Sequence, residues 1–296
     1  MARILCIGDA MLDVIVRMQG PMYLGSDTIS QISTHAGGAA ANTATWLAST
    51  SHSVFYVCRL GDDAAGQVIA NQLDTWNIEF KREFLSGHRT GIVVVLVDQN
   101  GERSMFPDRG ANSGLSEIDL PDLSRFDAVF LSGYSLFNPL SQDGVLRMID
   151  QIRKANVKIF FNPGSVGVMS NLGPEICRAR TQLMDLLIMN EAEAEFLTGQ
   201  SDTKSALEQL SQDVETVVIT ANRKGAMGRL RGQEIIDSPI KPITAIDSTG
   251  AGDAFAAGFI GRWIESKDLE SSLRAGNSLA SGCVATIGAR PSVNPE

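Results

Sequence analysis

The sequence has few of the residues that build disulfide frameworks or metal centres. Its 296 residues include four cysteines and three histidines. The cysteines are widely scattered without a Cys-x-x-Cys pair, and the histidines show no metal-ligand spacing. These absences exclude a disulfide-stapled scaffold and argue against a structural zinc site and a histidine-based catalytic triad. The same cysteine usage is typical of a reducing compartment, so we expect a cytoplasmic protein.

A long apolar run and an excess of positive charge are also lacking. No segment approaches the roughly 20 apolar residues needed to cross a bilayer, and the N-terminus lacks the long apolar stretch of a signal peptide. The net charge of −9 argues against nucleic acid and anionic membranes as partners. With 44% hydrophobic and 20% charged residues, the composition is ordinary for a soluble globular enzyme.

Short apolar segments alternate with amphipathic ones along most of the chain. Such alternation is typical of a parallel sheet covered by helices on both faces. No repeat or low-complexity linker divides the sequence. We therefore expect one α/β domain over residues 1–296, a three-layer αβα sandwich with a mostly parallel central sheet. The expected strands are 3–8, 54–60, 157–161, 183–189, 216–220 and 226–230, and the expected helices are 38–49, one beginning after 62–63, one around 145–152, 250–264 and 269–286.

Two regions break this alternation. Residues 14–34 and about 90–108 show β patterns without intervening helices, and the second contains the turn Asp98-Gln99-Asn100-Gly101 between two apolar runs. We expect both regions to form one small antiparallel layer standing off the main sheet. Such a layer could act as a lid, as a dimer surface, or as both.

The segment Asp247-Ser248-Thr249-Gly250-Ala251-Gly252-Asp253-Ala254-Phe255 carries the strongest chemical signal. Gly250, Ala251 and Gly252 allow close approach of a ligand, and the amides that open a helix favour an anion. Asp253 stands beside that anion site. Such a carboxylate either caps the helix or takes a proton from a hydroxyl that attacks a phosphate. The segment alone leaves both interpretations open. The sequence has no G-x-x-x-x-G-K-[ST] loop, and the third glycine of G-x-G-x-x-G is missing here.

Three motifs together resemble the ribokinase-like (PfkB) family of carbohydrate kinases. Residues 37–44 (GGAAANTA) and 59–66 (RLGDDAAG) resemble its first signature, and residues 247–255 resemble its second, D-[ST]-[ST]-G-A-G-D-x-F. The resemblance extends over essentially the whole chain and includes Gly110-Ala111-Asn112 after the hairpin. It implies the same three-layer fold with a β lid, and a kinase that uses ATP and Mg²⁺.

The resemblance also implies roles for individual residues. Asp253 is the expected base, and Gly250 to Gly252 are the expected anion hole for the γ-phosphate. The family's sugar-holding residues match Asp13, Gly37, Gly38 and Asn42.

The resemblance places the nucleotide and cations on further residues. Asn190 and Glu193 match a motif that positions Mg²⁺ and phosphate mostly through water, and they also match a helix capping box. The expected ATP-binding residues are Thr220, Asn222, Gly225 and Asn277, where Asn222 replaces a glycine and must tolerate an unusual backbone angle. In several relatives the region of Asp247 binds K⁺, which makes a K⁺ site a further hypothesis.

The acceptor is the least determined part of the prediction. Arg109 precedes the Gly-Ala-Asn motif, and its guanidinium would suit a carboxylate or phosphate on the substrate. Ribokinases carry a glutamate near the segment that here reads Phe130-Leu131-Ser132-Gly133-Tyr134, and its absence puts ribose in doubt.

We therefore predict an ATP-dependent kinase for a hydroxyl of a sugar or sugar-like molecule. A nucleoside kinase of the same family is the alternative, and a non-catalytic sugar-binding regulator is a further one. The exposed lid suggests a homodimer.

Overall fold

The computed structural model describes residues 2–50, 52–241 and 243–292. A nine-stranded sheet, in the order β15-β14-β13-β12-β11-β10-β1-β4-β6, forms its centre. The seven strands from β13 to β6 pair in parallel, while β13–β14 and β14–β15 are antiparallel. These strands are β1 (Arg3–Ile7), β4 (Ser53–Val57), β6 (Glu79–Phe80), β10 (Ala128–Ser132), β11 (Lys158–Asn162), β12 (Leu186–Asn190), β13 (Thr216–Thr220), β14 (Ala226–Leu230) and β15 (Ile236–Ser238).

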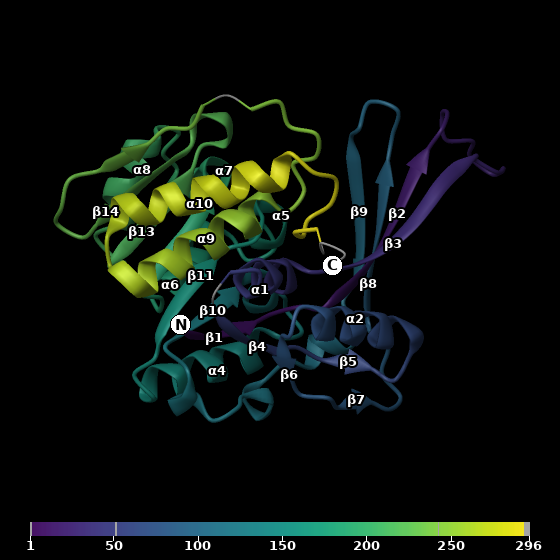
Figure 1. The fold of residues 1–296 in the computed structure, drawn as a ribbon, viewed down its shortest axis with the longest axis horizontal. Coiled ribbons are helices and arrows are strands. Elements are labelled where there is room, and N and C mark those ends of the chain that lie inside the picture. Colours follow the sequence, from purple (N-terminus) through teal and green to yellow (C-terminus); the bar gives the residue numbers. More distant parts are fainter. Residues whose placement is uncertain (1, 51, 242, 293–296) are drawn as a thin grey trace.

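Helices cover both faces of this sheet (Figure 1). Alternate strand residues divide between two cores: Ile4 and Cys6 pack with α1, α9 and α10, whereas Leu5 and Ile7 pack with α4, α7 and α8. This alternation produces the expected three layers. The helices are α1 (Ala39–Ala48), α2 (Ala64–Thr75), α3 (Gly133–Leu136), α4 (Gln142–Lys154), α5 (Val166–Met169), α6 (Pro174–Thr181), α7 (Glu191–Thr198), α8 (Thr203–Leu210), α9 (Ala251–Ser266) and α10 (Leu269–Val284).

Short elements complete the chain. A two-stranded sheet pairs β5 (Leu60–Gly61) with β7 (Phe84–Leu85). The expected strand 54–60 therefore ends early, and its last residue belongs to this other sheet. The 3₁₀ turns are η1 (Gly110–Gly114), η2 (Glu117–Asp119), η3 (Leu123–Arg125) and η4 (Asn222–Lys224). Among the described residues, no helix is long and apolar enough to span a membrane.

A separate four-stranded sheet stands off the body as the lid (Figure 1). Its order is β3-β2-β8-β9, from β2 (Met11–Met18), β3 (Ser30–Gly37), β8 (Gly91–Val97) and β9 (Arg103–Asp108). The expected β8–β9 hairpin is present, and the outer pairs are antiparallel. The prediction of a fully antiparallel layer is wrong, because the central pair β2–β8 runs in parallel. The chain between these two strands passes through the body before it returns, which permits the parallel pairing.

Candidate active site

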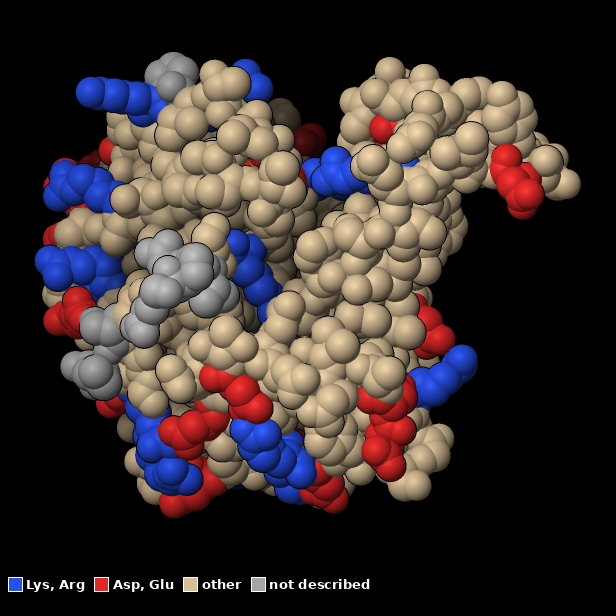
Figure 2. Space-filling model, turned by 45° about the vertical axis from the view of Figure 1, so that its right-hand side comes forward, with Lys and Arg blue, Asp and Glu red and all other residues tan. Residues whose placement is uncertain are grey.

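The candidate site lies at the topological switch point of the central sheet, where strands are added on opposite sides of β1. From β1 the chain adds β4 and β6 on one side, and it later adds β10, β11 and β12 on the other. Crevices form at the carboxyl ends of strands at such a switch point. Asp9 follows β1 here, and Tyr134 follows β10. The lid rises beside this edge, and Figure 2 shows a groove with basic side chains between lid and body.

Two adjoining cavities fill this groove. One, of about 1100 Å³, is lined by Asp13, Asn42, Arg109 and Asp253 among others. The other, of about 860 Å³, is lined by the expected nucleotide residues Thr220, Asn222, Gly225 and Asn277. Both cavities include Thr249 and Gly252 in their walls. The segment that links them is therefore the one that carries the expected anion hole.

The start of α9 forms this junction. Gly250 is the residue before the helix and has a φ of 77°, in the left-handed region that favours glycine. Its Cα packs so closely against Ala289 that a side chain would meet the Ala289 carbonyl oxygen. The amides of Ala251 and Gly252 open the helix, where orphan N–H groups and the helix dipole favour an anion. Asp253 lies in the first turn beside them.

Asp253 has the properties of a poised base. Its Oδ2 accepts a hydrogen bond of 2.9 Å from Asn42 Nδ2, across 211 residues of sequence. Desolvation, with contributions from nearby Asp13 and Glu193, raises the pKa of Asp253 to about 7 against the lowering effects of Asn42 and Arg290. A carboxylate with a pKa near neutrality can accept a proton and still be ionised in a large fraction of molecules.

Asp13 faces the same cavity from the lid strand β2. Its Oδ1 is buried and has no hydrogen-bond partner within the protein. A buried carboxylate oxygen without a partner is costly unless a ligand supplies the hydrogen. Desolvation raises the pKa of Asp13 to about 6. Gly37, paired near it on β3, has no side chain where one would collide with the Asp13 carboxylate.

Asn190 and Glu193 form a reciprocal cap at the start of α7. Asn190 Oδ1 accepts a hydrogen bond from the Glu193 amide (2.9 Å), and Glu193 Oε2 accepts one from the Asn190 amide (3.0 Å). Glu193 is nonetheless buried, and desolvation raises its pKa to about 7 despite the Asn190 hydrogen bonds. Both residues line the larger cavity, so the capping interpretation and a role beside a ligand are compatible.

The expected nucleotide residues come from three elements. Asn222 opens η4 with a φ of 49°, so it adopts the left-handed backbone that its substitution for glycine requires. Gly225 ends that turn. Asn277 of α10 donates to the carbonyl and hydroxyl oxygens of Ser238, at 2.8 and 3.1 Å. These contacts join α10 to the end of β15 beside the smaller cavity.

Asp247 precedes the anion hole and is densely hydrogen-bonded. Its Oδ1 accepts from Arg103 Nη2 (2.7 Å) and Thr249 Oγ1 (2.6 Å), and its Oδ2 accepts from the Gly288 amide (3.1 Å). Although desolvation would raise it, these hydrogen bonds hold the pKa of Asp247 well below its usual range. Arg103 belongs to β9, so this ion pair also joins the lid to the body.

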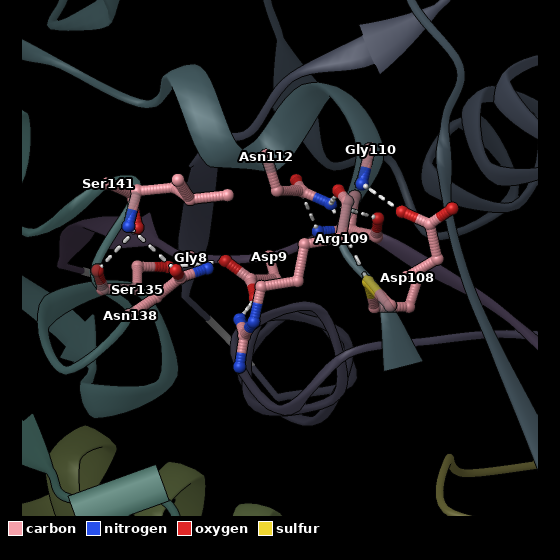
Figure 3. Close-up of polar contacts among 12 residues, drawn as sticks. Gly8, Asp9, Asp108, Arg109, Gly110, Asn112, Ser135, Asn138 and Ser141 are labelled. Atoms are coloured by element: carbon pink, nitrogen blue, oxygen red, sulfur yellow. Dashed lines mark hydrogen bonds and ion pairs between the residues drawn. The ribbon is translucent and has the colours of Figure 1, made fainter. Parts of the chain in front are cut away.

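Arg109 reaches the larger cavity from the end of the lid (Figure 3). Its guanidinium forms an ion pair with Asp9 and lies 5.6 Å from the centre of the Tyr134 ring. Ser135 Oγ donates to Asp9 at 2.6 Å. Asn112 fixes the same corner, because its side chain bonds the Ala10 amide (3.0 Å) and carbonyl (2.8 Å).

Two contributors lie outside the predicted site residues, although Gly8-Asp9 belongs to the family resemblance. Arg290 contacts Asn42, and Asp9 neutralises Arg109. Asp9 follows a strand-ending glycine, which a turn alone explains. Arg290 lies more than 200 residues from its partners in the sequence, so no local pattern reveals it.

Comparisons with known proteins identify the family and the fold. The family model described as "pfkB family carbohydrate kinase" matches residues 1–296. The chain is 30% identical over 272 residues to a ribokinase from Haemophilus influenzae, covering 87% of this chain and 83% of that protein. The structure of Arabidopsis thaliana ribokinase complexed with ribose and ATP aligns with a TM-score of 0.84 at 27% identity, covering 97% and 94% of the two chains.

An adenosine kinase from Sinorhizobium meliloti shares the fold, with a TM-score of 0.86 at 24% identity and coverage of 99% and 96%. Relatives with different acceptors thus share one architecture with this chain. The family match over the full length, the ribokinase identity and the three-layer fold with its lid lead to one conclusion: the chain belongs to the pfkB family of carbohydrate kinases, phosphotransferases that act on sugar hydroxyls.

Proposed function

We propose that this protein transfers the γ-phosphoryl group of ATP to a hydroxyl of a neutral sugar or sugar-like molecule, with Asp253 as the base. The observation that carries the proposal is the placement of Gly252 and Asp253. Gly252 lines both cavities, while Asp253 lines only the larger one. A phosphate held at the junction and a hydroxyl held beside Asp253 would be adjacent, which is the positioning that phosphoryl transfer requires.

In this proposal the acceptor lies in the larger cavity. Asp13 Oδ1 accepts a hydrogen bond from one acceptor hydroxyl, and Asn42 and the backbone of Gly38 border the same space. Asp253 removes the proton of the attacking hydroxyl. The oxygen then attacks the phosphorus as the bond to the leaving ADP oxygen breaks. The amides of Ala251 and Gly252 hold the negative charge on the transferring group.

The residues present fit ATP with Mg²⁺. The smaller cavity offers Thr220, Asn222, Gly225 and Asn277 to the nucleotide, and its far end reaches the anion hole. Glu193 and Asn190 would face the metal through water, because Mg²⁺ keeps several waters and rarely needs a full protein cage. Bound Mg²⁺ would neutralise phosphate charge during transfer.

The charges of the larger cavity favour a neutral acceptor. Asp9 already pairs with Arg109, and Asp13, Glu193 and Asp253 add negative charge to the walls. Arg109 would then contact a hydroxyl of the acceptor instead of a carboxylate or phosphate. An anionic acceptor would have to displace Asp9 from Arg109, which would leave a buried carboxylate unpaired.

A nucleoside acceptor is the second candidate. The larger cavity continues past the expected hydroxyl site to Tyr134, Pro139, Leu140 and Val168, an apolar wall that a base could contact. A non-catalytic regulator is a weaker candidate, because it would have no use for a base with a pKa near 7 beside an anion site.

Acceptor-dependent release of ADP tests the proposal. The panel consists of ketoses, aldoses, their phosphates, sugar acids and nucleosides, with Asp253→Asn as the matched variant. We expect turnover with at least one neutral polyol and a large loss in the variant. Absence of turnover with every compound, or an unimpaired variant, would refute the mechanism. A preference for sugar acids would refute the neutral acceptor alone.

A K⁺ site at Asp247 is a separate part of the proposal. K⁺ would have to share the carboxylate with Arg103, Thr249 and Gly288. Rates in potassium chloride and in tetramethylammonium chloride at equal ionic strength test it, and equal rates would discard the site.

We further propose that a second copy of this chain covers the outer face of the lid. The register places Val14, Val16, Val94, Leu96, Ile32 and Phe106 on one face. Ile32 and Phe106 are 67% and 57% exposed. An exposed apolar face of this kind is a mark of an interaction surface.

A further inference from the structure

The guanidinium of Arg290 is held by three acceptors from separate elements. Nε donates to Asn42 Oδ1 of α1 at 2.9 Å, and Nη1 donates to Gln72 Oε1 of α2 at 2.9 Å. Nη2 donates to the carbonyl oxygen of Gly37, at the end of β3, at 3.3 Å. A planar guanidinium with its donors fixed in three directions has little freedom to rotate. Arg290 thus has a defined position at the base of the lid.

The backbone before Arg290 is fixed against the anion hole. Trp46 Nε1 of α1 donates to the carbonyl oxygen of Ala289 at 2.9 Å. That same carbonyl lies against Gly250, where a Cβ would approach it to 2.5 Å. The segment that carries Arg290 therefore packs directly on the first residue of the proposed phosphate site.

Asn42 connects Arg290 to the proposed base. Its Oδ1 accepts from Arg290, and its Nδ2 donates to Asp253 Oδ2 at 2.9 Å. If the amide were reversed, Nδ2 would face the Arg290 donor and Oδ1 would face the carboxylate, and both contacts would be repulsive. Arg290 therefore reinforces the orientation of Asn42 in which Nδ2 faces Asp253. With Oδ2 engaged in this way, Oδ1 of Asp253 is the atom presented to an acceptor hydroxyl.

The charges around Asp253 give Arg290 a second effect. Desolvation, with contributions from Asp13 of β2 and Glu193 of α7, raises the pKa of Asp253 to about 7. Tyr134 of α3 and Cys283 of α10 also interact electrostatically with Asp253. Arg290 is the positive group that lowers the pKa of Asp253, and it lowers that of Asp13 as well.

We propose that Arg290 is a positioning residue that orients the Asp253 carboxylate through Asn42 and supplies its countercharge. The role for catalysis rests on the proposed function. The relay itself concerns only the free protein, and it can be measured without turnover.

The test follows the titration of Asp253 in the free enzyme. Aspartate labelled with ¹³C at its carboxyl group gives one NMR signal per residue, and the signal missing from Asp253→Asn identifies the base. We expect a midpoint near pH 7 in the wild type. Removal of an opposite charge should move it upward by about one pH unit in Arg290→Met. In Arg290→Lys, which keeps the charge, the midpoint of Asp253 should stay near that of the wild type. Arg274→Met, which removes an arginine paired with Glu270 on the surface, should not move it.

Kinetics provide the second readout once an acceptor is known. In Arg290→Met the acidic limb of kcat/KM should move with the NMR midpoint, so that activity falls about tenfold below the limb and recovers at higher pH. In Arg290→Lys the acidic limb of kcat/KM should stay at the wild-type pH, but kcat should fall, because an ammonium fits the three acceptors poorly. Circular dichroism verifies folding, and Arg290→Gln replaces Arg290→Met if the latter does not fold.

The two hypotheses fail separately. An unchanged NMR midpoint in a folded neutral variant overturns the role of Arg290, whether or not an acceptor has been found. A shifted midpoint without acceptor-dependent ADP release supports the relay and refutes the proposed function. A loss of kcat that is equal at all pH values, with no shift, indicates a structural role only.

Discussion

Asp253 combines a favourable and an unfavourable setting for negative charge. It lies in the first turn of α9, where the helix dipole stabilises an anion. Desolvation together with Asp13 and Glu193 nevertheless raises its pKa to about 7. The native protein therefore binds a proton at Asp253 that the unfolded chain has already lost. The stability from that proton is fully present below the unfolded pKa and is lost as the pH rises through about 7.

We expect Asp253→Asn to lower kcat by about 10²–10⁴-fold, because the base is lost, and to make the protein more stable. The gain should be largest above pH 7, where the wild type holds a desolvated carboxylate, and should shrink toward pH 4. Each kcal/mol corresponds to about 2–4 °C in melting temperature for a chain of roughly this size. Melting curves at pH 8 and pH 5 measure the difference. A variant less stable than the wild type at pH 8 would contradict this account of Asp253.

The pH dependence of the wild type follows from the same carboxylate. The base must be ionised to accept a proton, so kcat/KM should rise with pH through about 7 and then level off. Glu193, at about 7, and Asp13, at about 6, titrate nearby, so the limb reports the three groups together. Initial rates at saturating ATP across the pH range measure it. A flat profile between pH 5 and 8 would be inconsistent with Asp253 as the base.

At this scale the sequence predicts residues that lie in compact motifs. Gly250 to Asp253 are contiguous, and this short motif predicts a turn, the start of a helix and a carboxylate in its first turn. Arg290 carries no such signal, because Asn42, Gln72 and Gly37 are brought to it only by the folding of separate elements. A single arginine near the end of a chain is otherwise a surface residue by default.

At the scale of elements, the start of α9 depends on backbone conformation at Gly250 and on open space at Gly252. Gly250→Ala would place a Cβ 2.5 Å from the Ala289 carbonyl oxygen in a left-handed conformation. We expect it to cost at least about 1–2 kcal/mol of stability and to lower kcat as the amides shift. Urea unfolding monitored by tryptophan fluorescence measures the stability.

Gly252→Ala is the matched control. A Cβ there meets no protein atom within 4 Å, and the residue is helical, so alanine should raise stability by roughly 0.5–1 kcal/mol. Its methyl group would nevertheless enter the proposed phosphate position and lower kcat. If both variants lost stability equally, the proposed strain at Gly250 would be refuted.

Elements with local signals are predicted well from the sequence. Asp63 caps α2, Asn190 and Glu193 cap α7, and β13 and β14 begin and end at the predicted residues. Strand pairing is predicted less well. The alternating pattern of 14–34 and 90–108 indicates strands but contains no information on which strands become neighbours. The pairing depends on the path of the chain through the body, which brings β8 back parallel to β2.

At the scale of the whole molecule, the lid has two faces with different chemistry. One face carries Asp13, Arg103 and Met105 into the cavities. The opposite face is apolar, and β3 and β9 are the edge strands of the lid. Alternation along each strand predicts that two such faces exist. Which face meets the groove follows from how the lid attaches to the body, through Asn112 at Ala10 and through the Arg103–Asp247 ion pair.

If a second copy covers the outer face, the protein should sediment as a dimer, and its monomer should appear on dilution. Ile32→Glu and Phe106→Glu place a charge on the exposed part of that face and should shift the equilibrium to monomer, since burying an unpaired carboxylate is unfavourable. Ile118→Glu, at a residue that is 72% exposed on η2 of the body, is the control and should remain dimeric. Sedimentation velocity at several concentrations measures all four proteins. A wild type that is monomeric throughout, or a dimer that survives both lid substitutions, would show that the lid faces solvent or that another surface joins the copies.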